Sequence, residues 1–308
     1  MLKKKALKKI FISFSCLAIL GIIYLFPSKE QSNSSIILSN NETNTIYLKD
    51  NNNYISRVST ILTSKTQEDK IKEIIEILTI DSNKYIRDGF TKVIPKNTKL
   101  INVSIEDKLV KLNFSKDLLN VDINNEEKMI EAIVYSITSL DNIEYVSIYV
   151  DDNILNKLPN SNKRLNTILD RTIGINKEFN ITDITDTTST TIYYISKYND
   201  YYYYTPVTKI TNNDISKIEI IIKELTSSKI LNTNLMSYLN NNTELLSYNE
   251  TDKSLLLNFN DGILTDINAN NILEEVTYSI NLSIKDNYDV NEVLYYVNDK
   301  IVSTFSIK

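Results

Sequence analysis

An internal duplication is the feature of this 308-residue sequence that most constrains its fold. Short segments of the first half recur in the second half, in the same order and about 145 residues later. The segments that begin at Thr45, Ile71, Asn97, Tyr135 and Tyr149 match those that begin at Thr191, Ile218, Asn242, Tyr278 and Tyr296. The sequence therefore predicts two copies of one domain, at 45–153 and 190–300.

Each copy begins with the same predicted elements. β-Branched and aromatic residues at 45–50 and 54–60 indicate a strand and its hairpin partner. Apolar residues at helical spacing then predict an amphipathic helix, for which Thr66 is the expected N-cap. The apolar stripe consists of Ile71, Ile74, Ile75 and Leu78 in the first copy, and it recurs as Ile218, Ile221, Ile222 and Leu225.

A second hairpin and a second helix follow in each copy. The first copy's hairpin is predicted to bury one face, made of Ile101, Val103, Ile105, Val110, Leu112 and Phe114. The helix places Ile130, Ile133, Val134 and Ile137 on one face, which we match with Leu273, Val276, Thr277 and Ile280. With a closing strand the order is ββαββαβ, which predicts an α+β fold with helices packed on one face of a small sheet.

The rest of the chain is assigned from composition. Five lysines precede an uncharged run at 10–26, which is long enough for a short transmembrane helix and places the N-terminus in the cytoplasm. Residues 1–27 are therefore predicted to be a basic cytoplasmic end and membrane anchor, with a cleaved signal peptide as the alternative. The other assignments are a flexible linker at 28–44, a second linker at 154–189 and a C-terminal tail at 301–308.

Composition also excludes several classes of function. The sequence has no histidine, and its one cysteine, Cys16, lies in the apolar run, so catalytic triads, Cys–His pairs and structural zinc sites are excluded. The four glycines are too scattered for a phosphate-binding loop. A net charge of −5 argues against nucleic acid as a partner. We therefore expect no cofactor, no metal and no nucleic acid.

One long segment of the first copy carries a family resemblance. Residues 88–119 read "DGFTKVIPKNTKLINVSIEDKLVKLNFSKDLL", and they precede a helix ending "YSITSL" and a strand "IEYVSIYVDD". This pattern is similar to the GerMN domains of sporulation and spore-germination proteins. The second copy departs from it at Asn260 and Gly262, which stand where the first copy has Ser115 and Asp117. Two such domains behind a membrane segment resemble GerM-like proteins over nearly the whole chain.

The resemblance implies a location and a role. Such proteins lie on the outer face of a membrane, between mother cell and forespore, and are associated with a multi-protein channel complex. Their fold is similar to the ring-building modules of secretion systems, and no enzymatic activity comes with the family. We therefore expect a non-enzymatic single-pass membrane protein with an extracytoplasmic body that assembles with itself or with other proteins. The alternative is an envelope protein that binds or acts on peptidoglycan.

Two groups of residues are candidates for a site. Asp117, Asp151 and Asp152 are acids that a glycosidase or a calcium site could use, but the last two are typical of a polar turn and catalysis is not expected. Exposed aromatic residues can anchor a protein or stack on a glycan, whereas alternation along a strand buries them. The candidate interaction surface is the run of Tyr201, Tyr202, Tyr203 and Tyr204.

Overall fold

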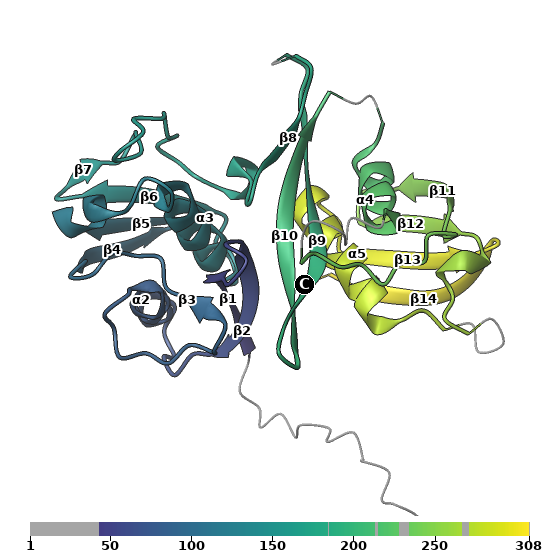
Figure 1. The fold of residues 1–308 in the computed structure, drawn as a ribbon, viewed down its shortest axis with the longest axis horizontal. Coiled ribbons are helices and arrows are strands. Elements are labelled where there is room, and N and C mark those ends of the chain that lie inside the picture. Colours follow the sequence, from purple (N-terminus) through teal and green to yellow (C-terminus); the bar gives the residue numbers. More distant parts are fainter. Residues whose placement is uncertain (1–42, 184, 213–214, 228–233, 267–270, 308) are drawn as a thin grey trace, which may run out of the picture. The chain divides into compact units, whose positions relative to one another are not determined.

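The computed structural model describes residues 43–307 except 184, 213–214, 228–233 and 267–270 (Figure 1). The predicted membrane segment at 10–26 and nearly all of the predicted linker at 28–44 lie outside the described residues. Among the helices that are described, none is both long enough and apolar enough to cross a membrane.

The first copy contains the predicted elements and two further short strands. The predicted hairpins and helices are confirmed, and Thr66 caps the first helix by accepting from the backbone N–H of Asp69. In chain order the elements are β1 (Thr43–Asp50), β2 (Ile55–Ile61), α2 (Gln67–Leu78), β3 (Phe90–Thr91), β4 (Leu100–Glu106), β5 (Leu109–Phe114), η1 (Lys116–Asn120), α3 (Glu126–Ile137), β6 (Tyr145–Val150) and β7 (Asn153–Ile154).

The second copy repeats this order. The segment between the copies contributes η2 (Arg171–Ile173) and β8 (Glu178–Asn180). The second copy then contains β9 (Thr188–Tyr198), β10 (Tyr201–Thr211), α4 (Lys217–Thr226), β11 (Leu245–Glu250), β12 (Ser254–Phe259), η4 (Asp261–Ile263), α5 (Glu274–Asn287), β13 (Glu292–Val297) and β14 (Lys300–Ser306).

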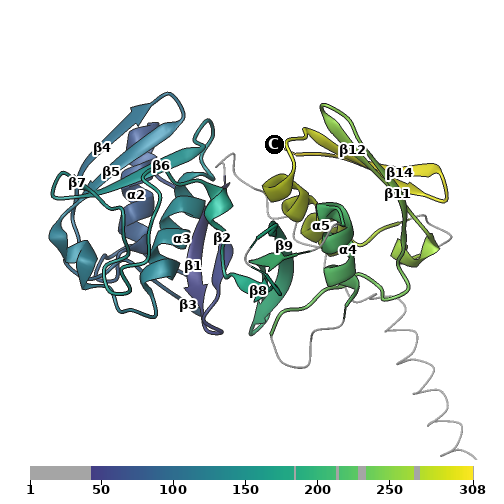
Figure 2. The ribbon, with the colours of Figure 1, turned by 90° about the horizontal axis from the view of Figure 1, so that it is seen from above.

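The helices of each copy lie between two sheets, which corrects the prediction of helices on one face of a single sheet. Figure 2 shows α2 and α3 between the hairpin β1–β2 and the sheet β4-β5-β6-β7, and α4 and α5 in the same position in the second copy. A helix covered on both sides must be apolar nearly all round. The nine residues of α3 from Met129 to Ile137 are all buried. The predicted single apolar stripe therefore underestimated how much of the surface of this helix is buried.

The segment predicted as a linker at 154–189 is packed against both copies. Leu158, Leu169 and Ile175 are buried in the first hydrophobic core. β8 pairs in parallel with β10. These apolar residues are widely spaced among polar ones, so periodicity did not reveal them. The tail predicted at 301–308 is likewise mostly strand β14, which pairs with β13 and completes a four-stranded sheet.

The sequence match between the second helices is wrong by one helical turn. The backbone N–H of Tyr47 donates to Ser136 on α3, and the N–H of the matching Tyr193 donates to Ser283 on α5. Val276, Ile280 and Ile284 are accordingly the buried apolar residues of α5. Apolar residues recur every three or four positions in such a helix, so a shift of four residues still aligns apolar with apolar.

One residue of the predicted hairpin face is exposed. Ile101 is 55% exposed, whereas Val103, Val110, Leu112 and Phe114 are buried as predicted. The strand register of β4 and β5 shifts between Leu100 and Asn102. A bulge of this kind adds an unpaired residue and interrupts the alternation of faces.

Candidate functional site

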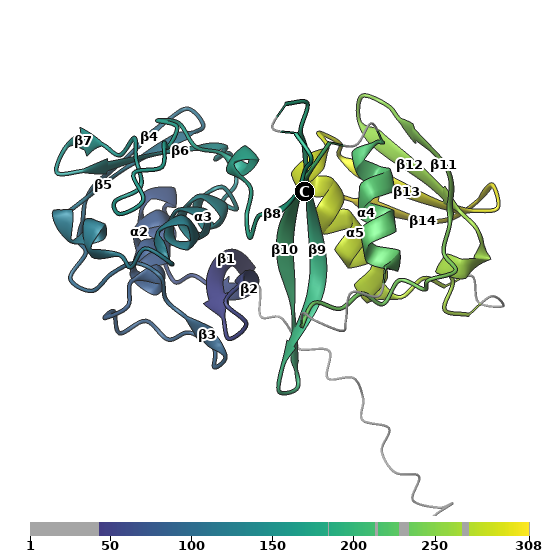
Figure 3. The same cartoon turned by 45° about the horizontal axis from the view of Figure 1, so that its top comes forward.

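The two copies meet along one β-sheet. Its strand order is β3-β1-β2-β10-β8, with β9 also paired to β10, and Figure 3 shows the long hairpin that β9 and β10 form. The neighbouring strands β2 and β10 pair in antiparallel fashion at Arg57 and Tyr204. Beside this pair the hydroxyls of Ser56 and Thr205 are 2.8 Å apart. The joint therefore combines backbone pairing with buried side-chain hydrogen bonds.

Equivalent residues of the two copies contact each other at this joint. Ser56 and Thr205 occupy the same position in their respective hairpins. Tyr47 and Tyr193 are also equivalent, and their hydroxyl oxygens are 2.8 Å apart. Contact between equivalent residues is the property of a two-fold interface. The duplicated domains are thus arranged as in a symmetric dimer, within one chain.

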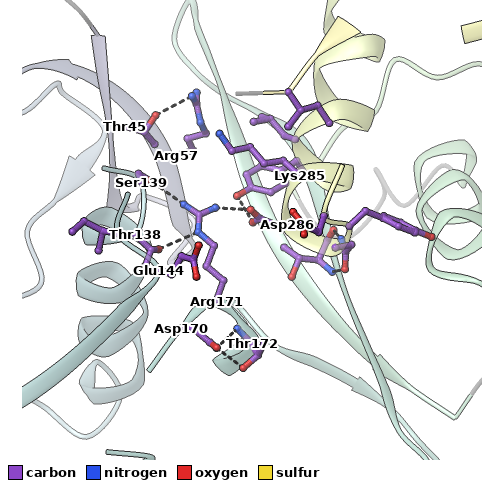
Figure 4. A pocket seen from close by; sticks show the side chains of 18 of the residues that line it. Thr45, Arg57, Thr138, Ser139, Glu144, Asp170, Arg171, Thr172, Lys285 and Asp286 are labelled. Atoms are coloured by element: carbon purple, nitrogen blue, oxygen red, sulfur yellow. Dashed lines mark hydrogen bonds and ion pairs between the residues drawn. The ribbon is translucent and has the colours of Figure 1, made fainter. Parts of the chain in front are cut away.

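Arg171 binds both copies at the joint (Figure 4). Its Nη1 donates to Asp286 Oδ1 at 2.5 Å, and its Nη2 donates to Ser139 Oγ at 2.8 Å. Because Ser136 and Ser283 are equivalent, Ser139 and Asp286, three residues further along each helix, are equivalent too. One guanidinium therefore binds the same position on α3 and on α5.

The ion pair is buried and its polar atoms are satisfied. The Asp286 side chain is 2% exposed. Its second oxygen accepts from the hydroxyl of Tyr193 at 2.7 Å. Burial lowers the pKa of Arg171, but the groups around it, with Asp286 first among them, together outweigh burial and raise that pKa. Burial also raises the pKa values of Tyr47 and Tyr193, so both phenols stay neutral.

A cavity of about 890 Å³ surrounds this network. Basic and acidic side chains line it in nearly equal numbers. Arg171 also donates from Nε to Thr138 Oγ1 and from Nη2 to the carbonyl of Tyr135. These partners all belong to the protein, so the network holds the two copies together. The phenols in it have raised pKa values and are therefore poor acids and bases at neutral pH.

The tyrosine run divides between the two copies. Tyr203 is buried, donates to Asp50 at 3.1 Å and packs edge-on against Phe90 of the first copy. Tyr202 is 48% exposed and lies beside Tyr238, which is 40% exposed. Strand packing therefore explains Tyr203, and an interaction surface at the run stays a prediction centred on Tyr202.

The candidate acids lie in turns. Asp151 and Asp152 have positive φ angles of 44° and 65° and connect β6 to β7, a geometry typical of a two-residue hairpin turn. Asp117 lies in η1 and accepts from the hydroxyl of Ser115. In the described part of the chain, no three acidic, histidine or cysteine residues are grouped so that they could hold a metal ion.

Sequence reasoning missed the two residues that form the ion pair. Arg171 lies in the predicted linker, and Asp286 lies near the end of α5, where the one-turn error concealed its equivalence to Ser139. The available signal was Arg171 itself, a charged residue followed by the apolar Ile173 and Ile175. That signal could suggest a packed segment, but it could not identify the partner.

The fold and the joint define a class: two copies of one α+β domain fixed together by a pseudo-symmetric polar interface. Residues 45–156 match the Germane family, described as sporulation and spore germination. The spore germination protein GerM of Bacillus subtilis strain 168 is 28% identical over 263 residues, which cover 83% of this chain and 71% of GerM.

A solved structure shows the same arrangement. The tandem GerMN domains of the sporulation protein GerM from Bacillus subtilis superpose with a TM-score of 0.76 at 28% identity, covering 84% of this chain and 92% of that chain. The chain is therefore similar to GerM over most of its length, and it shares the fold of the tandem GerMN domains. The predicted resemblance and the tandem α+β fold are confirmed.

Proposed function

We propose that this chain is a membrane-anchored, non-enzymatic envelope protein that uses its two GerMN domains as one rigid unit for assembly with other proteins during sporulation or germination. The observation that supports this most directly is the joint. Equivalent residues, a shared sheet and the buried ion pair of Arg171 and Asp286 hold the copies together. A rigid pair of domains presents two surfaces at a fixed spacing, which favours repeated assembly.

Two further features support the proposal. The basic end followed by the apolar run at 10–26 is typical of a membrane anchor. Tyr202 and Tyr238 form an exposed aromatic pair on the second copy, and tyrosine is enriched where proteins bind one another.

The test is site-specific photo-crosslinking in the native host. The full-length chain carries a tag and a photoreactive phenylalanine analogue in place of Tyr202. The matched control carries the analogue in place of Tyr85, which is 81% exposed and lies on the first copy. We expect the chain in the membrane fraction, with a discrete protein adduct from position 202 that is stronger than any from position 85.

Two results would contradict the proposal. Recovery of the full-length chain in the soluble fraction would refute the anchor. A chain that is monomeric, gives no protein adduct from either position and pellets with purified cell wall would instead support the peptidoglycan alternative.

A further inference from the structure

Three lysines line a pocket in the first copy, away from the joint. The pocket has a volume of about 430 Å³. Lys49 comes from β1, Lys92 directly follows β3, and Lys96 lies in the turn before β4. Asp122 is the acidic residue among the lining side chains, so the basic groups exceed the acidic ones. This volume lies within the usual range for small-ligand sites.

Neutral groups hold two of the three ammonium groups. Lys49 Nζ donates to Asn125 Oδ1 at 3.0 Å. Lys92 Nζ donates to the carbonyl and hydroxyl oxygens of Ser82 at 2.7 and 2.8 Å. Within the described residues, no carboxylate forms an ion pair with any of the three lysines. The three positive charges are therefore not offset by direct pairing inside the protein.

The neighbouring acids are engaged elsewhere. Asp122 accepts from the backbone N–H of Asn124. Asp81 accepts from the backbone N–H of Asn97 at 3.0 Å. Asp81 also acts on Lys92 through space, but burial is the larger effect and lowers the pKa of Lys92. An anion entering this pocket would supply the missing counter-charge and offset the burial cost of Lys92.

The second copy does not share this charge. Ile195 is equivalent to Lys49, since each pairs with the short segment beside its hairpin, at Met236 and Thr91 respectively. Asn241 is equivalent to Lys96, because each directly follows the residue whose carbonyl accepts the backbone hydrogen bond that closes the turn. The basic pocket is thus a property of the first copy, in a chain whose net charge is −5.

We propose that this pocket binds a phosphate group, with Lys49, Lys92 and Lys96 contributing its positive charge. Ammonium groups act as point charges and are common phosphate binders, whereas planar carboxylates are matched best by the forked guanidinium of arginine. No arginine lines the pocket among the described residues. The phosphate could belong to a free phosphate ion or to the phosphodiester of a glycerol-phosphate headgroup or polymer.

The test is calorimetric titration of the full-length chain, purified in a neutral detergent, at constant ionic strength. The probes are inorganic phosphate, glycerophosphoglycerol as the phosphodiester, and acetate. The variants are Lys49→Gln and Lys96→Gln, and the matched control is Lys253→Gln, an exposed lysine of the second copy. Circular dichroism checks that each variant is folded.

We expect millimolar binding of at least one phosphate probe. Each pocket variant should weaken it about tenfold, as is usual for loss of one charged hydrogen-bond donor. The control variant should bind like the unmodified chain. Binding of inorganic phosphate alone identifies a free phosphate or monoester, and binding of the diester identifies the headgroup or polymer.

Three results would overturn the proposal. These are no binding of either phosphate probe, equal binding by folded pocket variants, and acetate binding as tight as phosphate binding. The last result would mean that the pocket responds to negative charge in general.

Discussion

Removal of the Asp286 carboxylate should weaken the joint between the two copies. In Asp286→Ala, Arg171 loses its ion-pair partner and Tyr193 loses its hydrogen-bond acceptor. Loss of one partner of a buried ion pair typically costs 3–5 kcal/mol. The Arg171 side chain is 21% exposed, so water can partly replace the carboxylate. We therefore expect the low end of that range, about 3 kcal/mol.

The assay is urea unfolding followed by near-ultraviolet circular dichroism. The chain has no tryptophan and 20 tyrosines, so this signal reports on tyrosine packing, including the joint. The control is Asp289→Ala, an exposed acid just beyond the same helix, which should change the free energy of unfolding by less than about 0.5 kcal/mol.

A double variant separates the pair from its parts. Arg171→Met combined with Asp286→Leu removes both charges, so no uncompensated buried charge is left. We expect this double variant to be more stable than Asp286→Ala. The reasoning is refuted if Asp286→Ala loses no more stability than Asp289→Ala, or if the double variant loses the sum of the two single losses.

Three further changes test other parts of the structure. Burial would raise the pKa of Glu73, but hydrogen bonds from Ser64 and the ammonium of Lys84 lower this pKa to about 2. The stabilisation is present above about pH 4.5 and is lost as the pH falls towards 2. Unfolding measured across this pH range should therefore show that Glu73→Gln is less stable than the unmodified chain by about 2 kcal/mol at pH 6, and that the difference disappears near pH 2. Among the described residues the buried amide nitrogen of Asn281 has no hydrogen-bond partner, but its Oδ1 accepts from the buried hydroxyl of Tyr295 at 2.8 Å. Asn281→Val removes that acceptor and should therefore lower the thermal midpoint, by a loss of about 1–3 kcal/mol in the free energy of unfolding. Gly89 has a φ of +91°, and an added Cβ would lie 2.5 Å from the ring of Tyr198. Gly89→Ala should therefore reduce the free energy of unfolding by about 1–3 kcal/mol, which urea unfolding would show as a lower midpoint.

The sequence predicted local structure better than it predicted how the elements are combined. Periodicity located α2, and Thr66 was correctly predicted as its cap. A helix that buries one stripe has apolar residues at helical spacing, which can be recognised in the sequence. It could not show that α3 is covered on both sides by separate sheets, since pairing between strands depends on distant residues. It also could not bring Arg171 and Asp286 together, because they lie far apart in the chain, Arg171 in the segment between the copies and Asp286 in the second copy.

The divergence of the two copies is as informative as their similarity. The joint uses the same positions from each copy, yet Arg171 meets a neutral serine on α3 and a carboxylate on α5. A single guanidinium near a two-fold axis needs only one charged partner, so an acid at both positions would leave one carboxylate buried without a counter-charge. The asymmetry is thus required by charge balance. It also implies that Ser139→Asp should destabilise the chain although it makes the joint more symmetric, and urea unfolding of that variant would test this. A stabilised Ser139→Asp chain would mean that Arg171 can bind two carboxylates, and the charge-balance argument would be wrong.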